Sequence, residues 1–119
     1  MEKYLIVDAH EDLAWNMLTF GRDYTLPDYQ RGRVAVVFGT LFNAPLRRRL
    51  GDWDALCYAT FEEAHLLYRA QLEAYHRLAD KHPDMFRLVH TRSDLQAVLD
   101  HWHRKDTDEH PVGLVILME

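Results

Sequence analysis

The stretch R-V-A-V-V-F-G-T-L-F at residues 33–42 is almost continuously apolar and rich in valine. A strand with one face in water alternates apolar and polar residues, whereas a strand covered on both faces shows an unbroken apolar run. Such runs are typical of parallel sheets, in which crossover helices cover both faces. Residues 33–42 therefore predict an interior strand of a parallel sheet.

Further extended segments lie on either side of this stretch. Residues 4–9 read Y-L-I-V-D-A and residues 112–118 read V-G-L-V-I-L-M, and polar residues follow each of them. Short apolar runs with such boundaries predict strands, and the run at 112–118 again has the composition of a strand buried on both faces. A shorter extended segment is predicted at 86–89.

Helical periodicity fills the intervals between these strands. Between about Asp54 and His82, apolar residues recur at three- to five-residue steps with charged residues between them, which predicts one long helix. A short helix is predicted at 13–20. The sequence S-D-L-Q at 93–96 has the form of a capping box and predicts a helix that runs to about Arg104.

This alternation of strands and helices predicts an α/β fold with a parallel sheet. The length of 119 residues fits a single domain, and no linker or repeat divides residues 1–119. The N-terminal sequence M-E-K-Y-L-I-V-D has too short an apolar core for a signal peptide, and no window reaches the length of a membrane span. We therefore expect a soluble, cytoplasmic protein.

Composition narrows the classes of function. The formal net charge is −5 with 48% hydrophobic residues, which argues against a nucleic-acid or anionic-membrane partner. A single cysteine, Cys57, excludes an internal disulfide.

Metal-ligand residues stand at the ends of two predicted strands. His10 and Asp12 follow the first strand with one residue between them, so strand geometry would direct both side chains to the same side. Glu119 follows the last strand in the same way. The carboxyl edge of a parallel sheet is where active sites gather, and a carboxylate there can bridge two metal ions. His10, Asp12 and Glu119 are the candidate metal ligands.

Four segments together resemble one family. The sequence V-D-A-H-E-D-L-A-W at 7–15 resembles the first-strand metal motif of the membrane (renal) dipeptidases, which are metallopeptidases of the amidohydrolase-like barrel group. Residues 32–41 resemble the second strand of that family, and residues 86–95 resemble the stretch before its third strand. The sequence G-L-V-I-L-M-E at 113–119 resembles the third strand, which ends in a bridging glutamate.

The resemblance implies a fold and a function. It implies the N-terminal part of a (β/α)₈ barrel, a fold that takes roughly 250 residues, with about three of its eight strands present. It also implies dipeptide hydrolysis with two divalent metal ions, zinc being the expected metal, and a homodimer. His10 and Asp12 would ligate one metal and Glu119 would bridge both. No catalytic or substrate-binding residue is assigned within the chain, and we expect the chain to be inactive alone. The family has further histidines, but none of the others in this sequence matches a family motif: His65, His76, His82, His90, His101, His103 and His110.

Two other functions stay open. Another barrel metallohydrolase, such as a deaminase or a metal-dependent nuclease, would usually carry His-x-His on its first strand, where this chain has Asp12 as the third residue. The second alternative is a non-catalytic α/β module that binds a partner through an open sheet edge.

We assign no catalytic or metal-binding role to several other reactive or charged side chains. We expect Cys57 to be a buried helix cysteine, His101 and His103 to diverge on a helix, and residues 62–65 to form a solvated helix face. The basic triplet Arg47–Arg49 could meet a substrate carboxylate, although charge runs are usually solvated. The acidic residues in 106–109 lack the spacing of a calcium loop.

Overall fold

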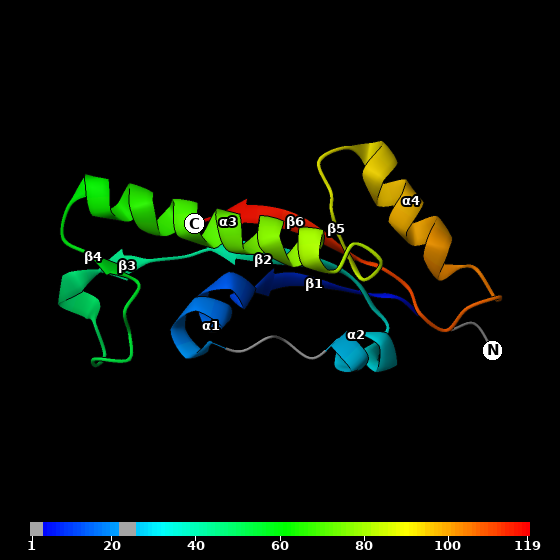
Figure 1. Cartoon of the computed structure of the whole chain (residues 1–119), viewed down its shortest axis with the longest axis horizontal. Helices are drawn as coiled ribbons and strands as arrows, with labels where there is room; N and C mark the ends of the chain where they lie inside the picture. Colours follow the sequence, from blue (N-terminus) through cyan, green and yellow to red (C-terminus); the bar gives the residue numbers. More distant parts are fainter. Residues whose placement is uncertain (1–3, 22–25) are drawn as a thin grey trace.

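A computed structural model describes residues 4–21 and 26–119 and shows a parallel sheet with helices on both faces (Figure 1). Residues 1–3, on which part of the expectation about a signal peptide rests, lie outside the described ranges. The main sheet has the strand order β1-β2-β6-β5, and a separate pair is formed by β3 and β4. The strands are β1 (Ile6–Glu11), β2 (Val34–Leu41), β3 (Ala44–Pro45), β4 (Cys57–Tyr58), β5 (Phe86–Leu88) and β6 (Val112–Met118).

The two predicted interior strands lie at the centre of the sheet. β2 pairs in parallel with β1 on one side and with β6 on the other. The β2–β6 register runs without a break from Val36 opposite Gly113 to Leu41 opposite Met118. The prediction of an α/β fold with a parallel sheet is therefore confirmed. Within residues 4–21 and 26–119 the sheet is open, with β1 and β5 at its edges, so the barrel stays a prediction.

The helices confirm the predicted pattern in part. The helix predicted at 13–20 is α1, and the long predicted helix is present but begins later than expected. The bounds are α1 (Leu13–Phe20), α2 (Leu26–Gly32), the 3₁₀ turn η1 (Leu46–Arg48), α3 (Phe61–Lys81) and α4 (Arg92–Trp102). Within the described part of the chain, none of the helices combines the length and the apolar character needed to cross a membrane.

Two predicted helix boundaries were wrong. The side chain of Thr60 accepts a hydrogen bond from the Glu63 amide and so caps α3 there, which leaves residues 54–60 outside the helix. The cap of α4 is Thr91, whose hydroxyl accepts from the Asp94 amide while the Asp94 carboxylate accepts from the Thr91 amide. Each threonine stands three residues before an acidic side chain, which is the capping-box pattern.

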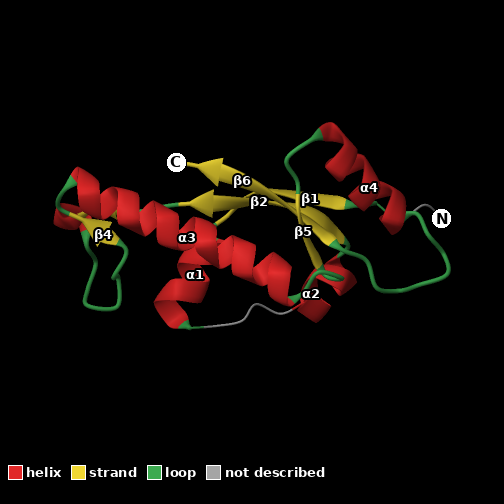
Figure 2. Cartoon of the chain, turned by 45° about the horizontal axis from the view of Figure 1, so that its top comes forward, coloured by secondary structure: helices red, strands yellow, loops and turns green. Residues whose placement is uncertain are grey.

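The helices lie on opposite faces of the sheet (Figure 2). One core cluster joins α1 and α3 to one face of β2 and β6, through residues such as Leu13, Tyr75 and Val37. A second cluster joins Val98 and Trp102 of α4 to the other face. The strand order explains why α4 lies on the other face. The chain crosses the sheet in one direction from β2 to β5 and in the opposite direction from β5 to β6. Because both crossovers are right-handed, their helices lie on opposite faces.

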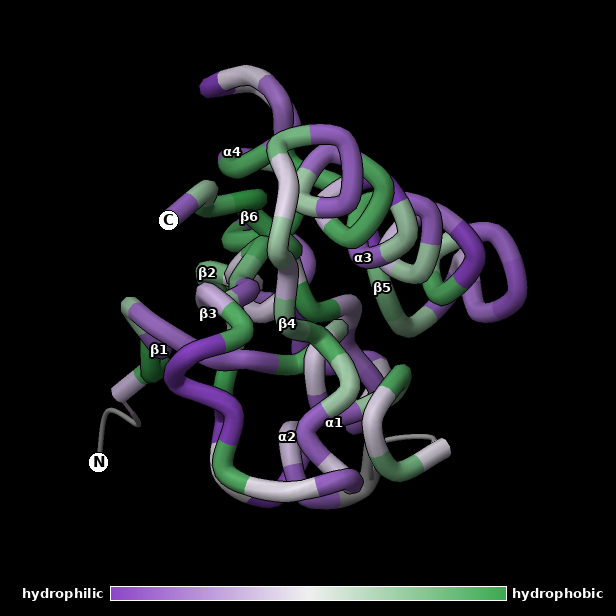
Figure 3. The backbone as a smooth tube through the Cα atoms, turned by 90° about the vertical axis from the view of Figure 1, so that its left-hand side faces the viewer, coloured by the Kyte–Doolittle hydropathy of each residue, from purple (hydrophilic) through white to green (hydrophobic). Residues whose placement is uncertain are grey.

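The hydropathy of each element agrees with its burial between the sheet and the helices (Figure 3). The tube is strongly hydrophobic along β6, whereas α3 alternates between hydrophobic and hydrophilic residues. Buried residues of α3 include Ala74, Tyr75 and Leu78, which share the face toward the sheet. At the outer edge, Ile6 and Val7 of β1 are about half exposed, at 49% and 54%.

Candidate metal centre

The carboxyl ends of β1 and β6 bring the three predicted ligands together. One ligand atom each from His10, Asp12 and Glu119 can be chosen such that all three lie within 4.8 Å of one another. The His10 Nε2 atom is in direct contact with a carboxylate oxygen of Glu119. The group lies at the surface, since the side chains of His10 and Glu119 are 51% and 35% exposed. The structure therefore places the sequence-predicted residues in one small volume, while metal binding by them stays a prediction.

The path of the chain to Asp12 differs from the expected one. β1 ends at Glu11, and its pairing with β2 is irregular between Asp8 and Glu11. Asp12 is the N-cap of α1, with φ −80° and ψ 51°, which is not strand geometry. The two ligands therefore converge through the turn from β1 into α1, and not through the alternation of side chains along a strand.

Glu119 is held in place by its main chain. Its amide donates to the Leu41 carbonyl at 3.3 Å, which extends the β2–β6 pairing by one step. Its carbonyl accepts from the Tyr68 hydroxyl of α3. Two contacts thus fix the backbone of this residue beside the end of β2 and leave its carboxylate directed at His10.

The electrostatics of the group favour a positive charge. The hydrogen bond with Glu119 is the main cause that raises the pKa of His10; burial lowers this pKa, and the negative charges of Glu119 and Asp12 raise it further. The carboxylates of Asp12 and Glu119 can be neutralised either by a protonated His10 or by a bound cation. Metal binding would therefore have to release the proton of His10.

Asp12 receives a fixed partner from β2. The hydroxyl of the buried Thr40 donates to Asp12 Oδ1 at 2.5 Å. Hydrogen bonds of this kind orient a ligating carboxylate and are common around metal sites. Sequence reasoning missed Thr40, because only the pairing of β1 with β2 brings it beside Asp12.

Glu11 lies between His10 and Asp12 in the sequence but is not part of the group of candidate metal ligands. Tyr29 of α2 donates its hydroxyl to Glu11 Oε1 at 2.6 Å, and burial raises the pKa of the Glu11 carboxyl. The neighbouring Asp8 accepts the His10 amide at 3.1 Å. These acids therefore support the turn and the α2 contact.

Cys57 and the basic triplet Arg47–Arg49 lie outside the group of three candidate metal ligands. Cys57 was expected to be a buried helix cysteine, but it lies in β4, because α3 begins only at Phe61, and its side chain is only partly buried. Burial raises the pKa of its thiol, which disfavours the nucleophilic thiolate. Arg49 donates to the carbonyls of its own loop at Gly51, Asp52 and Asp54. Arg47 and Arg48 are exposed on η1.

His101 lies in α4, whereas His103 is the residue that follows its last turn, so the prediction that both lie on one helix holds for His101 alone. The two side chains contact different groups, and one of these partners was not indicated by the sequence. His103 contacts the Leu99 carbonyl, whereas His101 Nδ1 lies 3.1 Å from His110 Nδ1. His110 is buried and stacks on Trp102. Across residues 4–21 and 26–119, His10, Asp12 and Glu119 form the one group of three or more metal-ligating residues that converges.

Comparison with known proteins adds no relative. No family model matches the chain, and no curated protein matches it.

Proposed function

We propose that this chain carries the first metal centre of a dipeptidase-type metallohydrolase with a (β/α)₈ barrel. The observation that supports the proposal most is the convergence of His10, Asp12 and Glu119 at the carboxyl edge of a parallel sheet. In barrel enzymes this edge carries the catalytic residues. The three residues are also those that the resemblance to membrane dipeptidases selects.

The donor set suits a catalytic zinc site. One imidazole and two carboxylates are ligands that zinc accepts, and three protein ligands leave a coordination position open for a water or a substrate. The exposure of His10 and Glu119 gives a substrate access to the group. His10 and Asp12 would hold one ion, and Glu119 would bridge it to a second ion that needs ligands beyond these three.

The chemistry follows from this arrangement. Divalent zinc supplies Lewis acidity, which makes a water nucleophilic and polarises the peptide carbonyl. The residues of the chain hold and orient: Thr40 fixes one oxygen of Asp12, and the Tyr68 contact fixes the main chain of Glu119. Dipeptides are the substrate class that the resemblance implies. We expect residues 1–119 alone to be inactive, because a second ion would need ligands beyond His10, Asp12 and Glu119.

The position of α4 differs from that of the other helices. This helix covers the sheet face opposite α1 and α3, which would become the barrel interior. The core cluster that it joins covers the amino-terminal and middle parts of the strands, from Ala35 to Phe38 of β2 and at Val115 of β6. In a barrel, α4 would therefore close the amino end and leave the carboxyl end, with the metal ligands, open.

A second candidate function rests on the open edge of β1. Ile6 and Val7 are half exposed there, and an unpaired edge can accept a strand from another protein. Such a non-catalytic module would need no metal. Metal binding therefore separates the two functions.

The test is zinc binding by equilibrium dialysis, measured on the wild type and on three variants: His10→Ala, Asp12→Asn and Glu119→Gln. We expect bound zinc in the wild type and weaker binding in each variant, because each removes one ligand. His65→Ala serves as the matched control, since His65 is exposed on α3 outside the group. Absence of bound zinc, or equal binding in all variants, would refute the proposal.

A further inference from the structure

Asp12 is the N-cap residue of α1, a position at which an aspartate carboxylate ordinarily caps the helix. Aspartate at a helix N-cap accepts a hydrogen bond from the amide of the second or third helical residue. At α1 the Asp12 carbonyl accepts from the Asn16 amide at 2.9 Å, so the helix begins in the usual way. The Asp12 side chain nevertheless makes no capping hydrogen bond.

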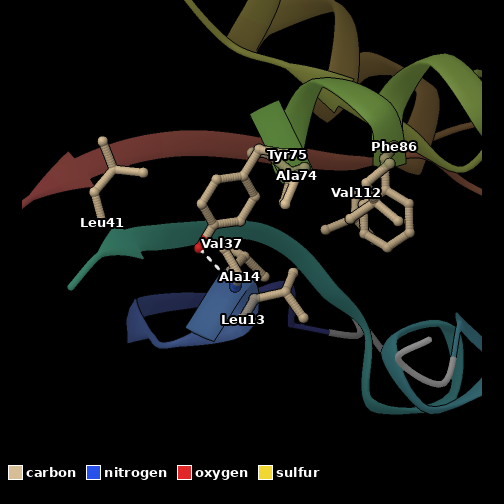
Figure 4. Packing of buried hydrophobic residues seen from close by; sticks show 10 residues of the cluster. Leu13, Ala14, Val37, Leu41, Ala74, Tyr75, Phe86 and Val112 are labelled. Carbon is tan, nitrogen blue, oxygen red and sulfur yellow. Dashed lines mark hydrogen bonds between the residues drawn. The ribbon is translucent and has the colours of Figure 1, made fainter. Parts of the chain in front are cut away.

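A tyrosine from a different helix takes the place of this cap. The amide of Ala14, the second residue of α1, donates to the hydroxyl oxygen of Tyr75 at 3.2 Å (Figure 4). Tyr75 belongs to α3 and its side chain is fully buried. Its own hydroxyl proton is donated to the Thr40 carbonyl at 2.9 Å. The amide that Asp12 would cap is thus satisfied from 61 positions further along the chain.

Thr40 connects the tyrosine to the aspartate. Its carbonyl accepts from Tyr75, while its hydroxyl donates to Asp12 Oδ1. Both groups belong to one fully buried residue of β2. One oxygen of the carboxylate is therefore fixed in direction, and an oxygen of the same carboxylate lies within 4.8 Å of the ligand atoms of His10 and Glu119.

We propose that Tyr75 and Thr40 are positioning residues, which free the Asp12 carboxylate from helix capping and direct it toward a divalent cation. This inference rests on the proposed metal site. Without the Tyr75 hydroxyl, the Ala14 amide would lose its acceptor, and the Asp12 carboxylate at the N-cap is the group placed to replace it. Capping and metal ligation would then compete for the same carboxylate.

The primary experiment compares zinc affinity in the wild type and in Tyr75→Phe, which keeps the ring and removes the hydroxyl. Competition with a chromophoric chelator, on protein shown to be folded by circular dichroism, gives the affinity. We expect a loss of about 10- to 100-fold in Tyr75→Phe. The cobalt-loaded protein provides a second measurement, because a displaced carboxylate changes the visible absorption bands of cobalt.

Thr40 provides an independent pair of variants. Thr40→Val keeps the shape and removes the hydroxyl, so zinc affinity should fall, whereas Thr40→Ser keeps the donor and should restore affinity close to that of the wild type. Val98→Ala is the matched control, because Val98 is fully buried in the core cluster on the other face and its truncation lowers stability without touching the site.

The outcomes separate this inference from the proposed function. If the wild type binds no zinc, the proposed site itself is wrong. If the wild type binds zinc and Tyr75→Phe binds it equally well, with only a loss of stability like that of Val98→Ala, Tyr75 is purely structural and the inference is overturned. Should Tyr75→Phe not fold, the Thr40 pair decides: equal affinity in Thr40→Val and Thr40→Ser overturns the inference.

Discussion

Gly39 shows how closely single residues are fitted around the candidate site. A Cβ atom at this position of β2 would lie 2.7 Å from ring atoms of Tyr75. The tyrosine ring has no room to retreat, because it is fully buried between α1, α3 and the sheet. Only glycine therefore allows Tyr75 to reach both Ala14 and Thr40.

We expect Gly39→Ala to lower the free energy of unfolding by about 1–3 kcal/mol, because overpacking forces buried groups apart. Chemical denaturation measures this change. Gly32→Ala is the control, since the nearest atom to its added Cβ would be a side-chain carbon of Val34 at 3.6 Å, an ordinary contact. Equal stability of Gly39→Ala and the wild type would show that Tyr75 is less constrained than the structure indicates.

Local patterns in the sequence predicted some residues of the site, and nonlocal contacts supplied the others. His10, Asp12 and Glu119 were recognisable because each follows an apolar run that predicts a strand. Thr40 and Tyr75 lie inside ordinary strand and helix patterns, and their hydroxyl contacts depend on how distant segments pack. A single sequence gives no indication of such contacts.

Among the elements, helix starts account for the largest errors. Leu56 and Ala59 fit the helical period, which extended the predicted helix before its true start at Phe61. The sequence T-F-E-E at 60–63 has the capping-box form, and Thr60 does accept from the Glu63 amide at 3.2 Å. The boundary could therefore have been predicted if the cap had been given more weight than the period.

The capping box of α4 makes the stability of the fold depend on pH. The amide of His90 donates to Asp94 at 3.0 Å, the Thr91 amide does the same, and these bonds lower the pKa of the Asp94 carboxyl. Because the pKa is lower in the folded state, the contribution is complete above the unfolded value of about 4. It is lost as the pH falls through the lowered folded value.

We therefore expect acid to destabilise the wild type more steeply than Asp94→Asn at pH values below about 4. The measurement is the free energy of unfolding by urea over a pH series. The other carboxylates are common to both proteins, so the difference between the two curves reports Asp94. Parallel curves would contradict the assignment of the capping box.

At the scale of the whole molecule, the sheet is strong at its centre and weak at one edge. β2 and β6 pair over six consecutive residue pairs, from Val36 with Gly113 to Leu41 with Met118. Within residues 4–21 and 26–119, β1 pairs on one side only and exposes part of its apolar surface. The parallel sheet was predictable from composition, whereas the reversed step from β5 to β6, and so the face that α4 covers, was not.

Native-state hydrogen exchange should show this gradient. We expect the amides of β2 that bond to β6 to exchange most slowly, through global unfolding, and those of β1 to exchange faster through local opening. Mass spectrometry of peptic fragments separates the two strands. Protection of β1 equal to that of β2 would indicate that another segment or a second copy covers the edge.

We propose that His10, Asp12 and Glu119 form a metal centre. X-ray absorption spectroscopy at the zinc edge, on the zinc-loaded protein, tests it most directly because it reports the ligand atoms themselves. We expect a nitrogen and oxygen shell at about 2.0–2.2 Å with the scattering of a single imidazole, and we expect this imidazole scattering to be lost in His10→Ala. A shell with two or more imidazoles, unchanged in His10→Ala, would place the zinc elsewhere, for example at His101 and His110, and would contradict the claim.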